Sequence, residues 1–488
     1  MAAPPDPVQE AQRRALRRAL THPDLSLGEL WRTFFALGGS LGPDEVEGFL
    51  AGESLPVRDR TLLAHAANQR LTERSAGLLV PVGPRRPRAA RSAGTALATL
   101  LDSVQQASAG EFGLIADRVG RSRGVRLVIY LADDERRLLV PFDPVREDRV
   151  RGPLLIERTL PGRAFRSGRT QTALTGPHPR WWIPVFDGAQ VTGVLDASPL
   201  DRHDLFDPLL RNEFEVLARL VGRLVTAAGA TGDTVDATRQ TRPRSVAAEL
   251  IWRLLPPLTA RTRSFSVSGL LEPAADVGGD VFDYALAPDH VDLAVFDAMG
   301  HALDAGLMAS ATLAAYRTSR RAGGGLQAQA AAIDAVLAAH FPDALVTGVL
   351  LHLDLTTGRL RYLGAGHPAP VVLRNARVVT ELSGGRRTPF GLPVAGNDGL
   401  PLGEFTLQPG DWLALHTDGV EEARDEAGNF FGRQRLVDFL ERAAAGDLGL
   451  AETVRRLTRA IMNHQNGSLQ DDATILLARW RDPRKESS

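Results

Sequence analysis

Four aspartates in the C-terminal half of the chain each follow an apolar, strand-like run and stand beside glycine or another acid. These aspartates are Asp280, Asp297, Asp418 and Asp471. Carboxylates at strand ends gather at the edge of a sheet, and neighbouring glycines let other backbone segments approach closely. Clustered carboxylate oxygens suit hard divalent cations. The pattern therefore favours a sheet-rich fold whose strand ends converge, and it indicates metal-assisted hydrolysis.

The composition excludes several classes of enzyme. The chain has no cysteine, which excludes thiolate phosphatases, thiol proteases, disulfides and cysteine-ligated metal sites. Its single lysine, Lys485, stands in the polar C-terminal tail. No residue is therefore available as a phosphate-loop lysine, a kinase strand lysine or a Schiff base, and ATP-dependent phosphoryl transfer is disfavoured.

Length and charge indicate a multidomain protein without a general attraction to polyanions. At 488 residues the chain is long enough for about three domains. Lysine and arginine number 57 against 58 acids, so the net charge of −1 attracts neither nucleic acid nor an anionic membrane. Apolar runs stay short of a membrane span, and the Pro-rich start lacks a signal-peptide layout. We expect a cytoplasmic protein with neither nucleic acid nor membrane as a partner.

Residues 1–80 carry helical periodicity and are predicted to form a helical N-terminal region. The apolar positions that set the period include Leu30, Phe34, Leu37, Leu41, Val46 and Leu50. Paired arginines at 13–14 and 17–18 are interpreted as a solvated helix face, with a partner-binding face as the alternative. Residues 81–92, rich in proline and arginine, are predicted to be an exposed linker.

A second domain is predicted over 93–230 from a helix, four strands and a long helix. The helices are expected near 95–107 and 207–228, and the strands near 125–131, 137–140, 182–186 and 191–195. This order resembles a GAF-type sensor domain, which implies an unknown small-molecule or protein signal. His178, which lies close to two tryptophans, is interpreted as a loop residue, with haem ligation as the weaker alternative.

The long helix carries a heptad-like stripe, which favours pairing of two chains as a homodimer. The stripe consists of Leu210, Phe214, Leu217, Val221 and Leu224. Packing on the domain's own core would produce the same pattern, so both interpretations stay open. A polar linker and a regulatory helix are predicted over 231–258, with Ser245 as the cap and Pro256-Pro257 as the end of the helix.

From 259 to 482 the periodicity indicates strands and grouped helices. Strands are predicted at 265–270, 291–296, 345–353, 358–363, 369–373, 412–416 and 474–479. Helices are predicted at 301–321, 327–339, 432–445 and 450–464. With the preceding regions, this indicates an α+β multidomain chain that ends in two packed sheets flanked by helices, an α-β-β-α sandwich.

The acidic segments resemble, in their order, the motifs of PP2C-type (PPM) bacterial serine/threonine phosphatases of the SpoIIE/RsbU family. The motifs are Val277-Gly278-Gly279-Asp280-Val281-Phe282-Asp283, Asp297-Ala298-Met299-Gly300-His301, Gly364-Ala365-Gly366-His367-Pro368, Pro409-Gly410-Asp411, Thr417-Asp418-Gly419-Val420-Glu421-Glu422-Ala423 and Asp471-Asp472-Ala473-Thr474. Any one alone is a common turn or strand end, whereas six in one order are a specific signal. The resemblance implies a phosphatase domain over 259–482.

The same resemblance implies two Mn²⁺ or Mg²⁺ ions. The residues that it assigns as both catalytic and metal-binding are Asp280, Asp297, Asp418 and Asp471. The backbone carbonyl of Ala298 is expected to complete one coordination shell, and Asp472 is the alternative to Asp471. Two such ions activate water for attack on phosphorus and neutralise the phosphate.

Several positions depart from the family's pattern or stay open. Ala302 stands where related sequences commonly have the glycine that opens the next helix. His301 lies four residues after the acid of its motif instead of two, and we interpret it as a helix-start residue, so that the role of general acid stays open. His367 is expected to brace its loop. Asp283 could contact the metal ligands without binding the metal itself. Asp411 is expected to belong to a turn. No phosphate-binding arginine is identified.

These features lead to the hypothesis of a sensor-regulated, metal-dependent protein serine/threonine phosphatase. The family implies a phosphorylated STAS-type anti-sigma-factor antagonist as substrate, in a stress-response pathway that controls a sigma factor by partner switching. The alternative is a signal-responsive scaffold that binds a partner without turnover, although retention of costly like-charge crowding argues against it. A metal-dependent nuclease would use similar carboxylates, but the balanced charge lacks a basic track.

Overall fold

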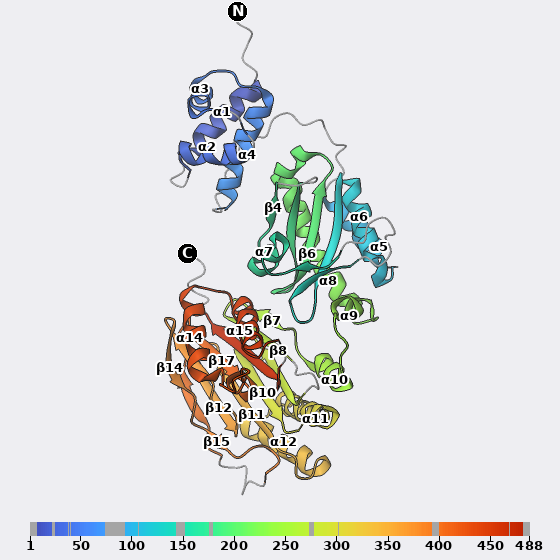
Figure 1. Ribbon diagram of the computed structural model, residues 1–488, viewed down its shortest axis with the longest axis vertical. Helices are drawn as coiled ribbons and strands as arrows, with labels where there is room; N and C mark the ends of the chain where they lie inside the picture. Colours follow the sequence, from blue (N-terminus) through green and yellow to red (C-terminus); the bar gives the residue numbers. More distant parts are fainter. Residues whose placement is uncertain are drawn as a thin grey trace, which may run out of the picture. The chain divides into compact units, whose positions relative to one another are not determined.

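The computed structural model describes most of the chain (Figure 1). The described residues are 7–21, 25–37, 39, 41–73, 93–105, 107–142, 152–174, 179–272, 278–300, 302–392, 400–467 and 469–481. The predicted linker at 81–92, His178, His301 and Lys485 lie outside them. The chain divides into two compact units, one of 1–187 with 191–239 and one of 188–190 with 240–488. Among the helices that are described, none is long and apolar enough to cross a membrane.

Between Pro7 and Glu73 the described residues form four helices, which confirms the predicted helical region. They are α1 (Pro7–Ala19), α2 (Leu27–Ala36), α3 (Pro43–Ala51) and α4 (Val57–Glu73). α2 begins after Ser26, whose hydroxyl accepts a hydrogen bond from the Glu29 N–H while the Glu29 carboxylate accepts one from the Ser26 N–H. The apolar faces of the four helices share one core.

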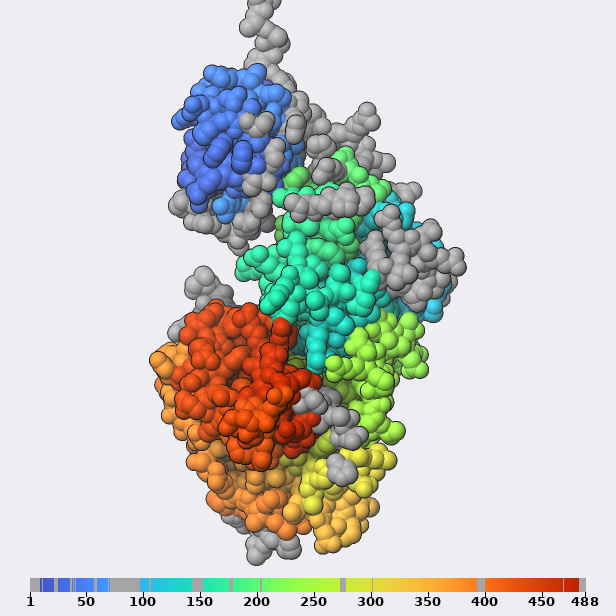
Figure 2. Space-filling model, in the orientation of Figure 1, coloured from blue at the N-terminus to red at the C-terminus, as the bar shows by residue number. Residues whose placement is uncertain are grey.

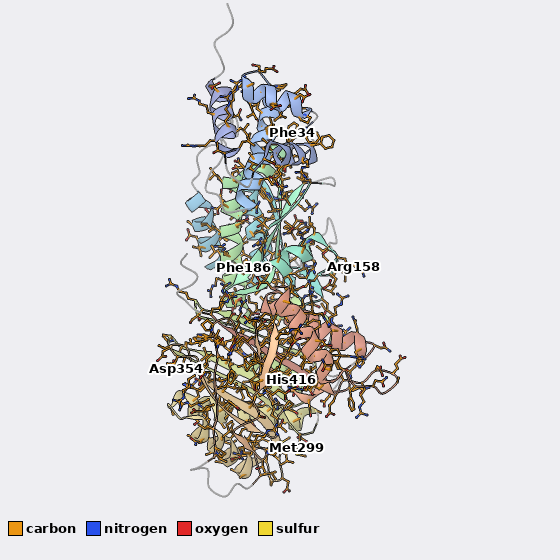
Figure 3. The ribbon with its side chains drawn as sticks, turned by 90° about the vertical axis from the view of Figure 1, so that its left-hand side faces the viewer. Phe34, Arg158, Phe186, Met299, Asp354 and His416 are labelled. Carbon is orange, nitrogen blue, oxygen red and sulfur yellow. The ribbon has the colours of Figure 1, made fainter. Side chains whose placement is uncertain are left out.

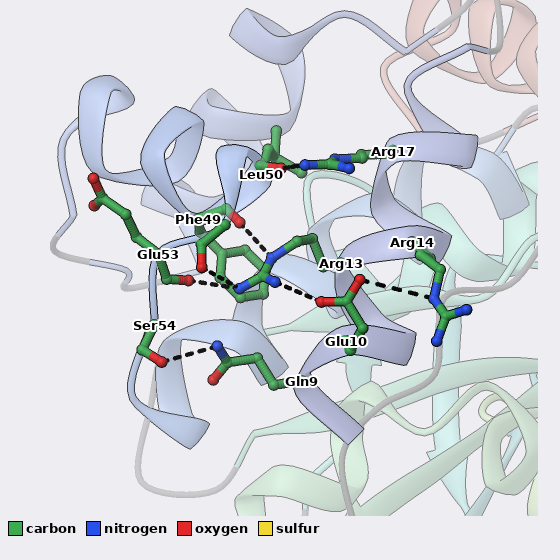
Figure 4. A network of polar contacts seen from close by, with 10 residues as sticks. Gln9, Glu10, Arg13, Arg14, Arg17, Phe49, Leu50, Glu53 and Ser54 are labelled. Carbon is green, nitrogen blue, oxygen red and sulfur yellow. Dashed lines mark hydrogen bonds and ion pairs between the residues drawn. The ribbon is translucent and has the colours of Figure 1, made fainter. Parts of the chain in front are cut away.

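Arg13 on α1 caps the end of α3, so the prediction of a solvated arginine face is wrong for this one of the four arginines (Figure 4). Its guanidinium donates to the carbonyls of Phe49 at 2.7 Å, Gly52 at 2.9 Å and Glu53 at 2.8 Å. The last carbonyls of a helix lack intrahelical donors and carry partial negative charge, so a cation is favoured there. Arg14, by contrast, is exposed as expected.

Replacing Arg13 by methionine is expected to destabilise the N-terminal helices by about 2–4 kcal/mol, because the buried Phe49 carbonyl and two part-buried carbonyls lose their charged donor. Arg14→Met is the matched control: the Arg14 side chain is 72% exposed and stands 3.9 Å from Glu10. Its effect should stay within about 0.5 kcal/mol. Urea denaturation followed by circular dichroism measures both, and equal stabilities of the two variants would contradict the capping role.

The described strands between 125 and 199 form one sheet in the order β3-β2-β1-β6-β5-β4. The strands are β1 (Val125–Ala132), β2 (Leu138–Pro141), β3 (Leu154–Leu155), β4 (Gln171–Ala173), β5 (Arg180–Asp187) and β6 (Gln190–Pro199). The helices are α5 (Ala93–Gln105), α6 (Phe112–Ser122), α7 (Leu160–Ser167), α8 (Pro208–Gly229) and α9 (Thr234–Arg239). The predicted order of helix, strands and long helix is confirmed, and α6, α7, α9, β3 and β4 are additions that the sequence patterns missed.

The apolar stripe on α8 packs inside its own domain. Leu210, Phe214, Leu217 and Val221 are buried in the domain core, and Leu224 packs against it. This is the alternative that the sequence left open. The stripe is already covered within the chain, so the prediction of a homodimer along it loses its basis.

The predicted helix before the C-terminal domain is α10 (Val246–Leu254), which packs on α11 (Ala302–Arg321). Its cap is Ser245, whose hydroxyl accepts a hydrogen bond from the Ala248 N–H at 3.2 Å. The helix ends before Pro256-Pro257, as expected, since a residue that precedes proline disfavours helical backbone.

Within the described residues the C-terminal unit contains two sheets that pack face to face, with helices outside them. The first sheet has the order β15-β12-β11-β10-β9 with β16 beside β12, and the second has the order β14-β13-β17-β18-β8-β7. Helices α11 and α12 pack on the first sheet, and α14 and α15 on the second, where in Figure 2 they form much of the orange-red surface. This arrangement confirms the predicted α-β-β-α sandwich.

The seven strands and four helices predicted for this domain agree closely in their bounds with the structure, whereas five of the described strands and one short helix were not predicted. The strands are β7 (Thr259–Arg261), β8 (Phe265–Glu272), β9 (Asp280–Leu286), β10 (His290–Ala298), β11 (Val346–Asp354), β12 (Arg359–Ala365), β13 (Val371–Arg374), β14 (Arg377–Glu381), β15 (Arg386–Arg387), β16 (Gly403–Thr406), β17 (Trp412–His416) and β18 (Ala473–Trp480). The remaining helices are α12 (Leu326–His340), α13 (Asp418–Glu421), α14 (Gly432–Ala445) and α15 (Leu450–His464). β9, which begins with one of the predicted metal ligands, was not predicted as a strand, because its polar and apolar residues follow a glycine pair without a clear period.

Candidate active site

The predicted acids lie where strands of both sheets begin or end. Asp297, near the end of β10, faces Asp280 at the start of β9 in antiparallel register. Asp418 stands two residues after the end of β17, and Asp471 stands two residues before β18, the antiparallel neighbour of β17. The expectation that every acid ends a strand is therefore wrong for Asp280 and Asp471. The acids still come together, because the start of one antiparallel strand lies beside the end of the next.

Two buried threonines tie the acids of the two sheets together. The Thr417 hydroxyl donates to Asp280 Oδ2 at 2.7 Å and accepts a hydrogen bond from the Thr474 N–H at 3.1 Å. The Thr417 N–H donates in turn to the Thr474 carbonyl. Both side chains are fully buried. Sequence reasoning assigned no role to either threonine, although each stands within two residues of a motif aspartate.

Glycines in the motifs allow backbone segments to pass at distances that a side chain would prevent. A Cβ atom at Gly279 would lie 2.2 Å from the Ala298 carbonyl oxygen, and one at Gly419 would lie 2.0 Å from the Asp472 carbonyl oxygen. Both contacts are with backbone, which cannot move aside independently. The close approach that the sequence predicted for these motifs is confirmed.

Asp280 is deeply buried, with 2% of its surface exposed. Burial, followed by the charges of Asp297 and Asp472, raises its pKa well above the ordinary value. A hydrogen bond from the Thr417 hydroxyl opposes this rise, because it stabilises the carboxylate. Asp280 therefore holds its negative charge only at a considerable cost in free energy.

The repulsion extends across the other predicted acids. Burial raises the pKa of Asp297 to about 7, with further contributions from the charges of Asp418, Asp471 and Asp472. Partial burial also raises the pKa of Asp418, helped by Asp471 and Glu422. Asp472 is buried, Asp297 is half-buried, and Asp418 and Asp471 are exposed. The acids thus form one interacting cluster that runs from the interior to solvent.

The chemistry of this cluster fits divalent cations. Its donors are carboxylate oxygens, and their mutual repulsion is what a bound cation would relieve. In the described part of the chain, no three histidine, aspartate or glutamate side chains already stand close enough together to hold one ion. The metal ions therefore stay a prediction, which rests on the donor set and its electrostatics.

Other residues named from the sequence have structural roles. The Nδ1 atom of His367 is hydrogen-bonded to the Thr347 hydroxyl at 2.9 Å, and burial lowers the pKa of His367 to about 3, so the ring is neutral and braces its loop. Asp411 accepts a hydrogen bond from the Gln408 N–H in its turn. Ala302 has a φ of +59°, which explains why glycine is common there in related sequences.

A buried histidine and its partners hold the short helix that carries Asp418. His416, labelled in Figure 3, ends β17 with 2% of its surface exposed, and its Nε2 atom lies 2.7 Å from Glu421 Oε1. Arg433 donates to the same oxygen at 2.8 Å. Glu421 is the last residue of α13 and Asp418 is the first. This support was not predicted, because His416 and Arg433 belong to different elements.

Comparisons with known proteins find a family match in the C-terminal part of the chain. Residues 287–481 match the family model described as Stage II sporulation protein E (SpoIIE). Protein IcfG of Synechocystis sp. is 24% identical over 338 residues, which cover 62% of this chain and 51% of that protein. The chain thus spans about half the length of this curated relative.

Two solved structures resemble a little under half of the chain. The SiaA-PP2C domain of Pseudomonas aeruginosa is 27% identical with a TM-score of 0.39, over 44% of this chain and 85% of that one. The RsbU and RsbW domains of a Mycobacterium tuberculosis protein are 25% identical with a TM-score of 0.37, over 45% and 60% of the two chains. On the family match and the six ordered motifs, the C-terminal half of this chain is a SpoIIE-type PP2C phosphatase domain.

Proposed function

We propose that this domain is a metal-dependent protein serine/threonine phosphatase. The residues that would hold two Mn²⁺ or Mg²⁺ ions, and through them serve catalysis, are Asp280, Asp297, Asp418 and Asp471, with Asp472 as the alternative to Asp471 and the Ala298 carbonyl as a further ligand. The observation that carries the proposal is the electrostatic coupling of these carboxylates. Burial and the charges of neighbouring acids from both sheets raise the pKa values of Asp280, Asp297 and Asp418.

The chain's own residues prepare this site for a phosphorylated side chain. Thr417 fixes the orientation of Asp280, and Glu421 with its partners fixes the helical turn that begins with Asp418. The exposed carboxylates of Asp418 and Asp471 are accessible to a phosphate carried on another protein. Bound divalent cations would neutralise that phosphate and lower the pKa of a water molecule.

The proposal extends to regulation and substrate. Residues 93–230 would act as a GAF-like sensor that responds to a small molecule or protein and controls the phosphatase. The substrate would be a phosphorylated STAS-type anti-sigma-factor antagonist, whose dephosphorylation changes the availability of a sigma factor. These two assignments rest on the family resemblance and on the order of elements in the sensor region.

Hydrolysis of a phosphoserine peptide by the full chain tests the core of the proposal. We expect turnover with Mn²⁺, none with EDTA, and a loss of about a thousandfold in the Asp418→Asn variant, which removes one ligand charge but keeps the side-chain volume. Asp438→Asn on α14 is the control and should keep full activity. Isothermal titration with Mn²⁺ distinguishes the phosphatase from the alternative of a scaffold without turnover. The phosphatase should bind two ions, whereas a scaffold need not bind them. Equal rates in all four assays would refute the phosphatase.

A further inference from the structure

A half-buried arginine joins the end of α10 to the strand that begins with Asp280. Arg317 on α11 donates through Nη2 to the Leu254 carbonyl at 2.8 Å and to Asp283 Oδ1 at 2.7 Å, and through Nε to Asp283 Oδ2 at 3.1 Å. Leu254 is the last residue of α10, and Asp283 lies three residues after Asp280 in β9. One guanidinium therefore holds three elements together.

The partners of this guanidinium leave little freedom at the joint. Asp283 has 2% of its side chain exposed and accepts a second ion pair from Arg320 at 2.7 Å. The next residue along β9, Tyr284, donates its hydroxyl to the Pro257 carbonyl at 2.5 Å. The segment 254–257 is thus tied to β9 twice, once through Arg317 and once directly.

The hydrogen bonds that Arg317 makes to Asp283 are charge-assisted and bidentate. Charge-assisted, bidentate hydrogen bonds are about twice as strong as neutral ones, and the Leu254 carbonyl is one of the helix-end acceptors that lack an intrahelical donor. Removing one partner of a buried ion pair leaves the other uncompensated. A substitution that removes the Arg317 guanidinium would therefore break its hydrogen bonds to Asp283 and to the Leu254 carbonyl. Asp283 or the end of α10 would then be displaced.

We propose that Arg317 is a positioning residue for Asp280, so that the affinity of the acidic cluster for divalent cations depends on the contact between α10 and β9. Because Asp280 and Asp283 belong to the same strand, a shift of Asp283 moves Asp280 relative to Asp297, its partner on the neighbouring strand β10. The inference rests on the proposed function, since it assigns metal binding to Asp280.

The test compares two arginines in matched environments. Arg317→Gln removes the contacts of Arg317 with Asp283 and the Leu254 carbonyl, and Arg374→Gln removes the ion pair between Arg374 and Asp411. The two ion pairs are similarly buried: the side chains of Arg317 and Asp283 are 19% and 2% exposed, and those of Arg374 and Asp411 are 25% and 1% exposed. Isothermal titration of the full chain with Mn²⁺ should show about a tenfold or greater rise in Kd for Arg317→Gln and less than a twofold change for Arg374→Gln. Arg317→Lys should lie between wild type and the glutamine variant.

The outcomes separate this inference from the proposed function. Mn²⁺ binding in wild type that is unchanged in Arg317→Gln, or weakened equally in both glutamine variants, would overturn the positioning role alone. Failure of wild type to bind Mn²⁺ would overturn the proposed function together with it. If Arg317→Gln does not fold, Tyr284→Phe removes only the bond to Pro257, and an unchanged Kd in that variant, instead of the expected rise of about threefold, would also overturn the role.

Discussion

Asp297→Asn is expected to lose about a thousandfold of phosphatase activity while the metal-free protein becomes more stable at pH 8. The gain arises because the pKa of Asp297 is raised to about 7 by burial and neighbouring charges, whereas in the unfolded chain it is near 3.9. Between these values the folded protein binds a proton that the unfolded chain releases, so the free energy of unfolding falls as pH rises. Asparagine carries no charge at any of these pH values, so the variant lacks this loss of stability.

We expect a gain of about 1–3 kcal/mol at pH 8 that largely disappears near pH 4, measured by urea denaturation in EDTA. Asp354→Asn is a control of opposite sign. Hydrogen bonds from the backbone N–H groups of Thr357 and Thr356 lower the pKa of Asp354, so its removal should cost stability at pH 8. A stability difference between Asp297→Asn and wild type that does not depend on pH would contradict the crowding of carboxylates.

Gly279→Ala is expected to cost about 3 kcal/mol or more and to abolish Mn²⁺ binding. The added Cβ would stand 2.2 Å from the Ala298 carbonyl oxygen and 2.7 Å from the Ala298 Cβ, so β9 and β10 would have to separate where their two aspartates face each other. Urea denaturation and isothermal titration measure the two effects.

The matched control for this prediction lies in the same sheet. Gly364 on β12 has no atom within 4 Å of an added Cβ, and Gly364→Ala should change stability by less than about 0.5 kcal/mol. If both alanine variants were equally stable, the close approach at Gly279 would not be what holds the two strands together.

Local sequence patterns were enough to predict where most helices and strands of the C-terminal domain begin and end. β17, α14 and α15 have the predicted bounds, and Ser245 caps α10 as expected, because hydrophobic periodicity and capping are properties of neighbouring residues. The acids of the proposed active site could be identified for a similar reason. Each belongs to a short motif that can be recognised without knowing what lies next to it.

Which distant residues pack against or pair with these local elements could be seen only in the folded structure. Arg13 and Arg14 are equivalent in the sequence, yet one is buried against three carbonyls and the other is exposed. Likewise, β8 and β18 are neighbours although they lie far apart in the chain. The partners of a buried charge and the pairing of distant strands depend on long-range packing, which short-range periodicity does not encode.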